Sequence, residues 1–154
     1  MSGNAPEIDL PHLPRARVAI ISSSWHLDIC NDLIAGAQRA LAAAAIKDVE
    51  VIYVPGSFEI PLASQIAFEK GFDAVVAVGL VLEGETPHFD YVCQGVTQGV
   101  MDVSLKFSSP IGFGVLMCNT LDQAIARSGR PGSSEDKGYD SAVAAIKLLQ
   151  LKEG

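Results

Sequence analysis

Four short runs of apolar, mostly β-branched residues punctuate the chain and predict the strands of a sheet. They cover residues 17–22, 49–54, 74–82 and 110–117. The first and third runs are almost continuously apolar, which is typical of strands that are covered on both faces. We therefore expect a buried sheet with helices packed on each side of it.

Longer stretches with apolar residues at helical spacing lie between and after these runs. The expected helices cover about 29–41, 60–67, 87–107, 121–128 and 134–151. Alternation of strands and helices favours parallel strands joined by right-handed crossovers. The expected fold class is therefore α/β, in three layers, with a four-stranded parallel sheet and helices on both faces.

The last two expected helices are separated by residues 129–133, which include helix-breaking glycine and proline. Ser133 or Ser134 is expected to cap the last helix. Glu135 and Asp136 would then lie in its first turn, where the helix dipole favours acids.

The length of 154 residues is typical of one domain. We expect residues 1–14 to form an extended N-terminal arm and residues 15–154 to form the domain, because the arm has several prolines and no apolar run. The arm could add to the sheet of a neighbouring molecule. Since the arm does not resemble a signal peptide and no run is long enough to span a bilayer, no membrane partner is expected.

Composition narrows the classes of function. Hydrophobic residues make up 49% of the chain and charged residues 19%, which is a mild argument for an oligomer that covers apolar surface. A net charge of -7 argues against a general nucleic-acid role. The three cysteines are widely spaced and form neither a zinc nor a disulfide pattern, so a reducing cytoplasm is the expected location.

The carboxyl ends of the four strands indicate where a ligand would bind, since open parallel sheets bind ligands at that edge. The loops that follow the strands are residues 22–26, 55–59, 83–88 and 118–120. They bring the only tryptophan of the chain, a phenylalanine, an acid and a histidine to one edge.

The third of these loops suggests acid–base chemistry and an anion site. Thr86 and Pro87 are typical of a helix start, whose free amides could bind phosphate, although an ordinary capped helix is the more common explanation of such a pair. Glu85 would repel an anion unless it points to solvent. His88 lies in the first turn, where the dipole favours a neutral imidazole that can exchange protons; the alternative is a packing or solvent-facing histidine.

Several other side chains have two readings. Trp25 and Phe58 could stack on a planar ligand or pack against the protein. Glu59 could accept hydrogen bonds from ligand hydroxyls or act as a first-turn helix acid. Arg127 complements a helix dipole or binds phosphate, and it would reach the strand edge only by folding back or from another subunit. Lys137 opens a helix, where a cation is disfavoured, which hints at another role.

Five segments in the same order resemble the lumazine synthases. They are Ser-Ser-Trp-His at 23–26, Pro-Gly-Ser-Phe-Glu-Ile-Pro at 55–61, Gly-x-Thr-Pro-His-Phe-Asp-Tyr-Val-Cys at 84–93, Phe-Gly-Val-Leu at 113–116, and Glu-Asp-Lys-Gly at 135–138. The resemblance covers about residues 15 to 150. The second and third segments together are highly specific.

The resemblance implies a flavodoxin-like strand order and a transferase of riboflavin biosynthesis. Such an enzyme condenses 5-amino-6-(D-ribitylamino)uracil with 3,4-dihydroxy-2-butanone 4-phosphate to give 6,7-dimethyl-8-ribityllumazine, the direct precursor of riboflavin, and releases phosphate and water. It needs no cofactor and no metal. The resemblance also implies a homopentamer with active sites between adjacent subunits.

The resemblance also assigns roles to individual residues. The residues assigned to the pyrimidine ring and the ribityl chain are Trp25, Ser57, Phe58, Glu59, Val81 and Leu82. Those assigned to phosphate binding and proton transfer are Gly84, Glu85, Thr86 and His88. From the adjacent subunit, Phe113 would cover the ring, Arg127 would bind the phosphate and Lys137 would approach the carbonyl end of the ring.

This chain departs from the family pattern in two places. Glu83 and Glu85 replace the basic and the small or neutral residues of many relatives, and we expect both to face solvent. The linker 129–138 is about two residues longer than in relatives that form hollow shells, which favours a lone pentamer. The alternative function is a non-catalytic flavin-binding oligomer, and riboflavin is a candidate product-like ligand even of an enzyme.

Overall fold

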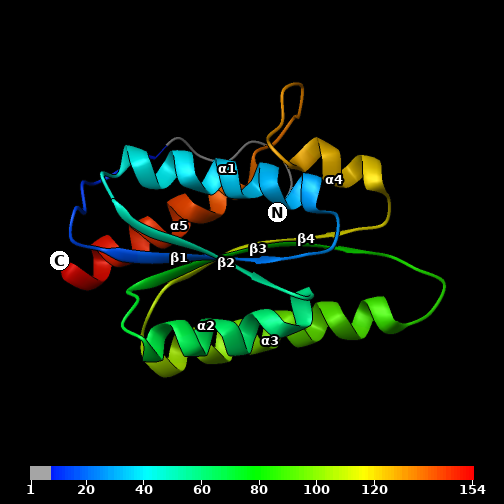
Figure 1. Ribbon diagram of the computed structural model, residues 1–154, viewed down its shortest axis with the longest axis horizontal. Coiled ribbons are helices and arrows are strands. Elements are labelled where there is room, and N and C mark those ends of the chain that lie inside the picture. The colour runs from blue at the N-terminus through cyan, green and yellow to red at the C-terminus, as the bar shows by residue number, and fades with distance from the viewer. Residues whose placement is uncertain (1–7) are drawn as a thin grey trace.

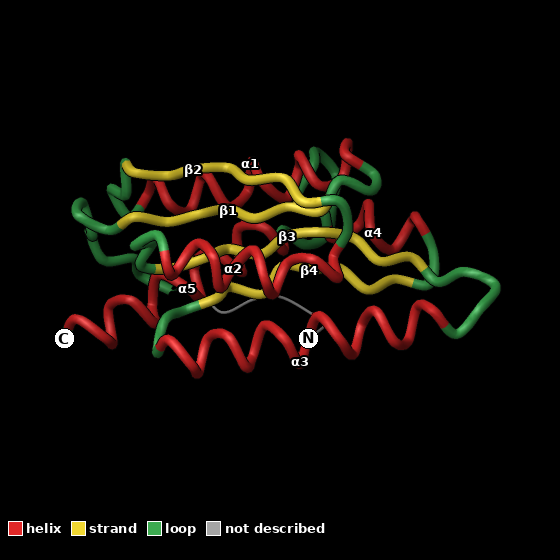
Figure 2. Tube along the Cα trace, turned by 60° about the horizontal axis from the view of Figure 1, so that its bottom comes forward, coloured by secondary structure: helices red, strands yellow, loops and turns green. Residues whose placement is uncertain are grey.

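A computed structural model describes residues 8–154 of the chain. Four parallel strands form one sheet: β1 (Arg17–Ser23), β2 (Asp48–Val54), β3 (Ala74–Leu82) and β4 (Ile111–Cys118). Their order is β2-β1-β3-β4, and Figure 2 shows them side by side in that order. The predicted three-layer α/β class and the flavodoxin-like order are confirmed.

Helices cover both faces of the sheet (Figure 1). One layer consists of α1 (Leu27–Ala43), α4 (Leu121–Arg127) and α5 (Lys137–Glu153). The other consists of the short 3-10 helix η1 (Ser57–Glu59), α2 (Ile60–Glu69) and α3 (His88–Phe107). Among the described residues 8–154, no helix combines the length and the apolar character that crossing a membrane requires.

The two faces of the sheet have separate apolar cores. Ile20 of β1 belongs to the core under α1 and α5, whereas its neighbour Ile21 belongs to the core over α2 and α3. Both side chains are fully buried, and burial of a side chain of this size contributes about 1.5–3 kcal/mol. The continuous apolar run of β1 is therefore explained by alternate residues facing opposite cores.

The start of α5 lies unusually close to α1. A Cβ atom added to Gly138 would overlap the backbone carbonyl of Leu33 in α1. A Cβ atom added to Gly36 would lie 2.9 Å from the amide nitrogen of Tyr139. Glycine on each helix thus allows the two backbones to approach, and the contact fixes where the first turn of α5 lies.

The predicted cap of the last helix is wrong. The helix begins at Lys137, and the side chain of Asp136 caps it by accepting from the Tyr139 amide. The hydroxyls of Ser133 and Ser134 instead donate to the carbonyls of Ile125 and Ala126, at 2.6 and 3.2 Å. Those carbonyls lie at the end of α4 and need partners of their own, so they take the serines away from the helix that follows.

The part of the expected N-terminal arm that the structure describes is tied to the body of the domain. Leu13 is buried, and its amide donates to the carbonyl of Ala44 at 2.8 Å, while Leu10 packs against the same core. Residues 1–7 of the arm lie outside the described residues. That the arm adds to a neighbour's sheet stays a prediction.

The helix contact at Gly138 gives a testable prediction. We expect Gly138→Ala to destabilise the fold by about 1–3 kcal/mol or more, because the added methyl group meets backbone that cannot rotate away. Chemical denaturation would measure the loss. Gly84→Ala is the matched control, since nothing lies within 4 Å of the added atom. Equal stabilities of the two variants would contradict the close packing.

Candidate active site

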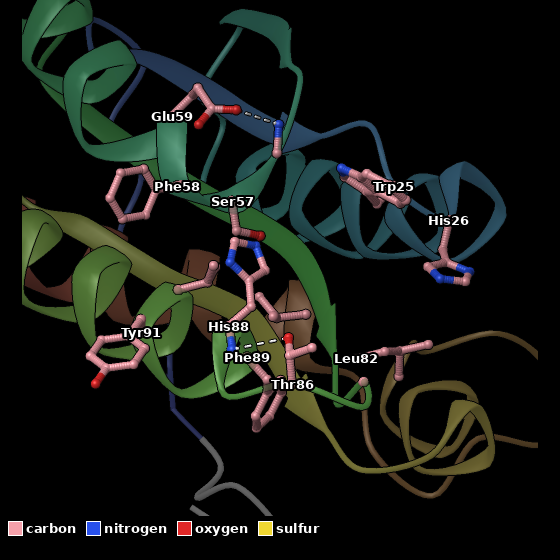
Figure 3. Close-up of a pocket in the computed structure, with 14 residues that line it drawn as sticks. Trp25, His26, Ser57, Phe58, Glu59, Leu82, Thr86, His88, Phe89 and Tyr91 are labelled. Carbon is pink, nitrogen blue, oxygen red and sulfur yellow. Dashed lines mark hydrogen bonds between the residues drawn. The ribbon is translucent and has the colours of Figure 1, made fainter.

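A hollow of about 710 Å³ lies at the carboxyl ends of the strands (Figure 3). Three loops and the first turns of α3 form its walls. The lining residues are Trp25, His26, Gly56, Ser57, Phe58, Glu59, Val81, Leu82, Gly84, Thr86, His88, Phe89, Tyr91 and Val92.

Most of the site residues predicted from the sequence meet in this hollow. The nine that line it are Trp25, Ser57, Phe58, Glu59, Val81, Leu82, Gly84, Thr86 and His88. Glu85, Phe113, Arg127 and Lys137 do not line it. The last three are the residues that the resemblance assigns to an adjacent subunit.

Two hydrogen bonds from side chains hold the turn that carries Trp25. The Ser24 hydroxyl donates to the carbonyl of Val54 at 2.7 Å, and the Cys30 thiol donates to the carbonyl of Trp25 at 3.2 Å. His26 takes the left-handed conformation, with φ 53°, at the entry to α1. Such a backbone is costly for a residue with a side chain. Trp25 itself lies beside Gly56 and is 67% exposed, so most of its surface is open to a ligand.

The turn after β2 is closed by its own acid. Oε1 of Glu59 accepts from the amide of Gly56 at 2.9 Å, which is the first-turn role foreseen as an alternative. Within residues 8–154, the other carboxylate oxygen of Glu59 accepts no hydrogen bond, which leaves it for a ligand hydroxyl. Phe58 is 61% exposed and its ring lies against Gly95 of α3, where an added Cβ atom would come within 2.6 Å of it.

Ser57 holds a polar atom with nothing to bond to. Its side chain is buried, and within residues 8–154 its Oγ has no hydrogen-bond partner. Space for this hydroxyl comes from Gly79 of β3, because an added Cβ atom there would lie 3.0 Å from Ser57 Oγ and 2.6 Å from Ser23 Oγ. Sequence reasoning missed Gly79, although a lone glycine inside an apolar strand is a signal of close approach.

The loop after β3 presents a histidine and a helix start. The imidazole of His88 points from the start of α3 toward the turn that carries Ser57 (Figure 3). Thr86 Oγ1 accepts from the His88 amide at 3.4 Å, but the expected cap by Thr86 is wrong, because the helix begins at His88 with Pro87 as its N-cap and without a side-chain cap. Glu83 and Glu85 are exposed and line no part of the hollow, as expected. Asp90, the acid in the first turn of α3, does not line the hollow either, so an anion bound inside it at this helix start would meet amides.

Sequence reasoning missed five lining residues. They are His26, Gly56, Phe89, Tyr91 and Val92. Residues three and four positions apart share one face of a helix. The position of His88 could therefore have indicated Tyr91 and Val92.

The two predicted cations lie together at the junction of α4 and α5. Nη1 of Arg127 donates to the carbonyl of Gln123 at 2.9 Å, so the dipole role foreseen for this residue is present. Glu135 lies between the cations, 3.3 Å from Arg127 Nε and 3.1 Å from Lys137 Nζ. Oδ2 of Asp140 lies 3.8 Å from Lys137 Nζ. Burial raises the pKa of the Asp140 carboxyl, and the ammonium group of Lys137 counteracts part of that rise.

Phe113 occupies a separate position on the edge strand β4. It is 40% exposed, in the middle of the strand. On this strand its neighbours two residues away, Ile111 and Val115, pack into the core over α2 and α3. Phe113 therefore faces the same side of the sheet and is available to another molecule along this edge.

Comparison with known proteins decides the family. The chain matches the model of the family described as 6,7-dimethyl-8-ribityllumazine synthase over residues 15–153. The chain belongs to the 6,7-dimethyl-8-ribityllumazine synthase family. A relative of that name from Streptomyces coelicolor is 49% identical over 147 residues, which are 95% of this chain and 91% of the relative. Another, from Pseudarthrobacter chlorophenolicus, is 50% identical over 152 residues, with 95% and 94% covered. One from Mycobacterium sp. (strain KMS) is 44% identical over 156 residues, with 100% and 97% covered.

Membership in the lumazine synthase family confirms the resemblance on which the sequence interpretation depended. It also agrees with the observed fold, because the family's matched region includes every described strand and helix.

The raised pKa of Asp140 gives a prediction for this family member. A carboxyl whose pKa rises on folding binds more protons in the folded state, so its ionisation costs stability as the pH rises through that pKa. We expect Asp140→Asn to raise the free energy of unfolding at neutral pH. The gain should fade at about pH 3, where the carboxyl is protonated in both states. Urea denaturation at the two pH values would measure it, and a lower free energy of unfolding for the variant at neutral pH would contradict it.

Proposed function

We propose that this chain is a 6,7-dimethyl-8-ribityllumazine synthase that acts in riboflavin biosynthesis. It condenses 5-amino-6-(D-ribitylamino)uracil with 3,4-dihydroxy-2-butanone 4-phosphate. The observation that carries the proposal is the hollow, which combines an exposed aromatic ring, a histidine and a helix start in a member of this family. Its activity is the penultimate step of the pathway.

The aromatic ring, the histidine and the helix start meet most demands of this reaction. The aromatic amine attacks the ketone carbon, and loss of water gives an imine. A proton is then lost from the carbon beside the imine, a C=C bond forms there, and inorganic phosphate leaves with the electrons of its C–O bond. The resulting enol becomes a ketone, the second amine attacks its carbon to close the ring, and a second water is lost. No step changes the redox state. Holding two substrates together lowers the barrier most, and fixed donors for the departing phosphate add to this.

Different parts of the hollow suit the two substrates. Trp25 would stack on the pyrimidine ring, and the backbone of Val81 and Leu82 would face its polar edge. The uncommitted oxygen of Glu59 and the unpaired hydroxyl of Ser57 suit a polyol such as the ribityl chain, with Phe58 alongside.

The phosphate would lie at the start of α3. Main-chain amides of Gly84 and Glu85, with the hydroxyl of Thr86, would receive it, and His88 would transfer protons nearby. The exposed position of the Glu85 side chain supports its role through backbone alone.

A second copy of the chain would complete the site. Phe113, Arg127 and Lys137 lie outside the hollow of their own chain. The outer faces of α2 and α3 also expose large apolar side chains, namely Leu62, Ile66, Tyr91, Met101 and Leu105. Because α2 and α3 pack against each other, apolar side chains exposed on both helices would suit an interface with another chain. We propose a cytoplasmic homopentamer, without shell formation, in which one subunit offers the hollow and its neighbour offers the cations.

A flavin carrier is the second candidate function. The exposed Trp25 ring favours it, because riboflavin is planar and resembles the product. A carrier has no use for a histidine and two cations around a leaving phosphate, so the enzyme is preferred. Mixing the two substrates separates the candidates: an enzyme forms the fluorescent lumazine, and a carrier binds riboflavin without forming it.

The His88 substitution tests the division of labour in the hollow. We expect His88→Ala to lower kcat by roughly 10²–10⁴, the usual contribution of a proton-transfer group, while substrate positioning preserves residual activity. Fluorescence of the product would measure it. His12→Ala is the control, because His12 is exposed and lies outside the hollow. Complete loss of activity in a folded His88→Ala protein would contradict this role.

Complementation tests whether neighbouring chains share a site. His88→Ala and Arg127→Ala proteins, unfolded together and refolded, should regain activity well above either alone, because about one interface in four would then combine two intact halves. Each variant refolded by itself is the control. Light scattering should give a mass of about five chains. No recovery in mixed rings of that mass would show that each chain holds its whole site.

A further inference from the structure

Glu135 is enclosed between the two cations of the α4–α5 junction. Its side chain is 10% exposed. Oε2 lies 3.3 Å from Arg127 Nε, and Oε1 lies 3.1 Å from Lys137 Nζ. The lysine does not approach Oε1 in hydrogen-bonding geometry, so the contact is ionic. One carboxylate therefore links both cations that the proposed function assigns to the neighbouring hollow.

The backbone, rather than the cations, fixes the position of Glu135. Its amide donates to the carbonyl of Ala126 at 3.0 Å. The next residue, Asp136, pairs with Ser128 in an antiparallel bridge and forms an ion pair with Arg39 of α1 at 2.8 Å. The carboxylate thus starts from a fixed point on the body of the domain, and the flexible cations are the groups that it can orient.

Arg127 shows what this orientation achieves. Its Nε faces Glu135 and its Nη1 faces the carbonyl of Gln123. Among residues 8–154, Nη2 donates no hydrogen bond. Two contacts fix the plane of the guanidinium, and a planar fork with a fixed orientation is what phosphate recognition requires.

We propose that Glu135 is a positioning residue that aligns Arg127 and Lys137 for the phosphate bound in the hollow of the adjacent subunit. This proposal rests on the proposed function. A carboxylate beside two cations weakens their attraction for an anion, so the gain from Glu135 lies in alignment rather than in binding. Removal of Glu135 therefore has two opposing effects, stronger attraction and poorer alignment, and we expect the loss of alignment to dominate in the departure of phosphate, where position matters most.

The test compares Glu135→Gln with the wild-type assembly. We expect kcat to fall roughly tenfold to hundredfold, since a small misplacement of a reacting or stabilising group has effects of this size. KM for the phosphorylated ketone should change by less than about threefold. Glu135→Asp keeps the charge and should lie between the two proteins. Asp48→Asn is the matched control, because it also removes an acid paired with an arginine, Arg17, at 2.9 Å, and should leave both constants unchanged.

A double-mutant cycle tests whether Glu135 acts through Arg127. If it does, adding Glu135→Gln to Arg127→Ala should change kcat little beyond the single Arg127→Ala change. Fully additive losses would overturn the proposal, as would an unchanged kcat in the single variant or a rise in KM with no fall in kcat. Thermal unfolding and mass are measured for each protein. If Glu135→Gln does not fold, Glu135→Asp takes its place in the cycle, with the same criteria.

The activity of the wild-type protein distinguishes a failure of this proposal from a failure of the proposed function. A wild type that forms no lumazine overturns the proposed function, whatever Glu135 does. Calorimetry with inorganic phosphate then tests the alignment: the Glu135→Gln assembly should bind phosphate with a different enthalpy from the wild type, while the affinity changes by less than about threefold because the two effects on binding oppose each other. An identical enthalpy would overturn the positioning role.

Discussion

Burial of both faces of the parallel sheet is the constraint on which the rest of this structure depends. β1 and the first seven residues of β3 are almost entirely enclosed between two layers of helices. Polar groups buried there would need internal partners, so most polar side chains able to meet a ligand lie where strands end. The hollow and its three loops are the direct result of that exclusion.

The second constraint is the contact of α1 with α5. Because Gly138 has no side chain, the first turn of α5 reaches the backbone of α1. Lys137 stands one residue before that contact, and Asp136, which caps the helix, is paired with Arg39 of α1. The contact between α1 and α5 therefore also determines where the cations lie at the junction of α4 and α5.

The sequence predicts the strands and helices well where a single pattern dominates. Continuous apolar runs and a regular helical stripe left few alternatives for β1, β3 and α3. The start of α5 could not be predicted, because Ser133 and Ser134 are drawn to the exposed carbonyls of α4, which is a tertiary effect. The hollow follows from the rule on strand ends. The enclosure of Glu135 between two cations depends on side-chain packing that no spacing reveals.

The openness of the hollow in one chain has a kinetic consequence for the proposed assembly. Trp25 is 67% exposed, and no lysine or arginine among residues 8–154 lines the hollow. An isolated chain would leave the imine in contact with bulk water, where it hydrolyses. Ring formation would then act as the switch that shields the intermediate, so the specific activity of the protein would depend on its concentration at high dilution.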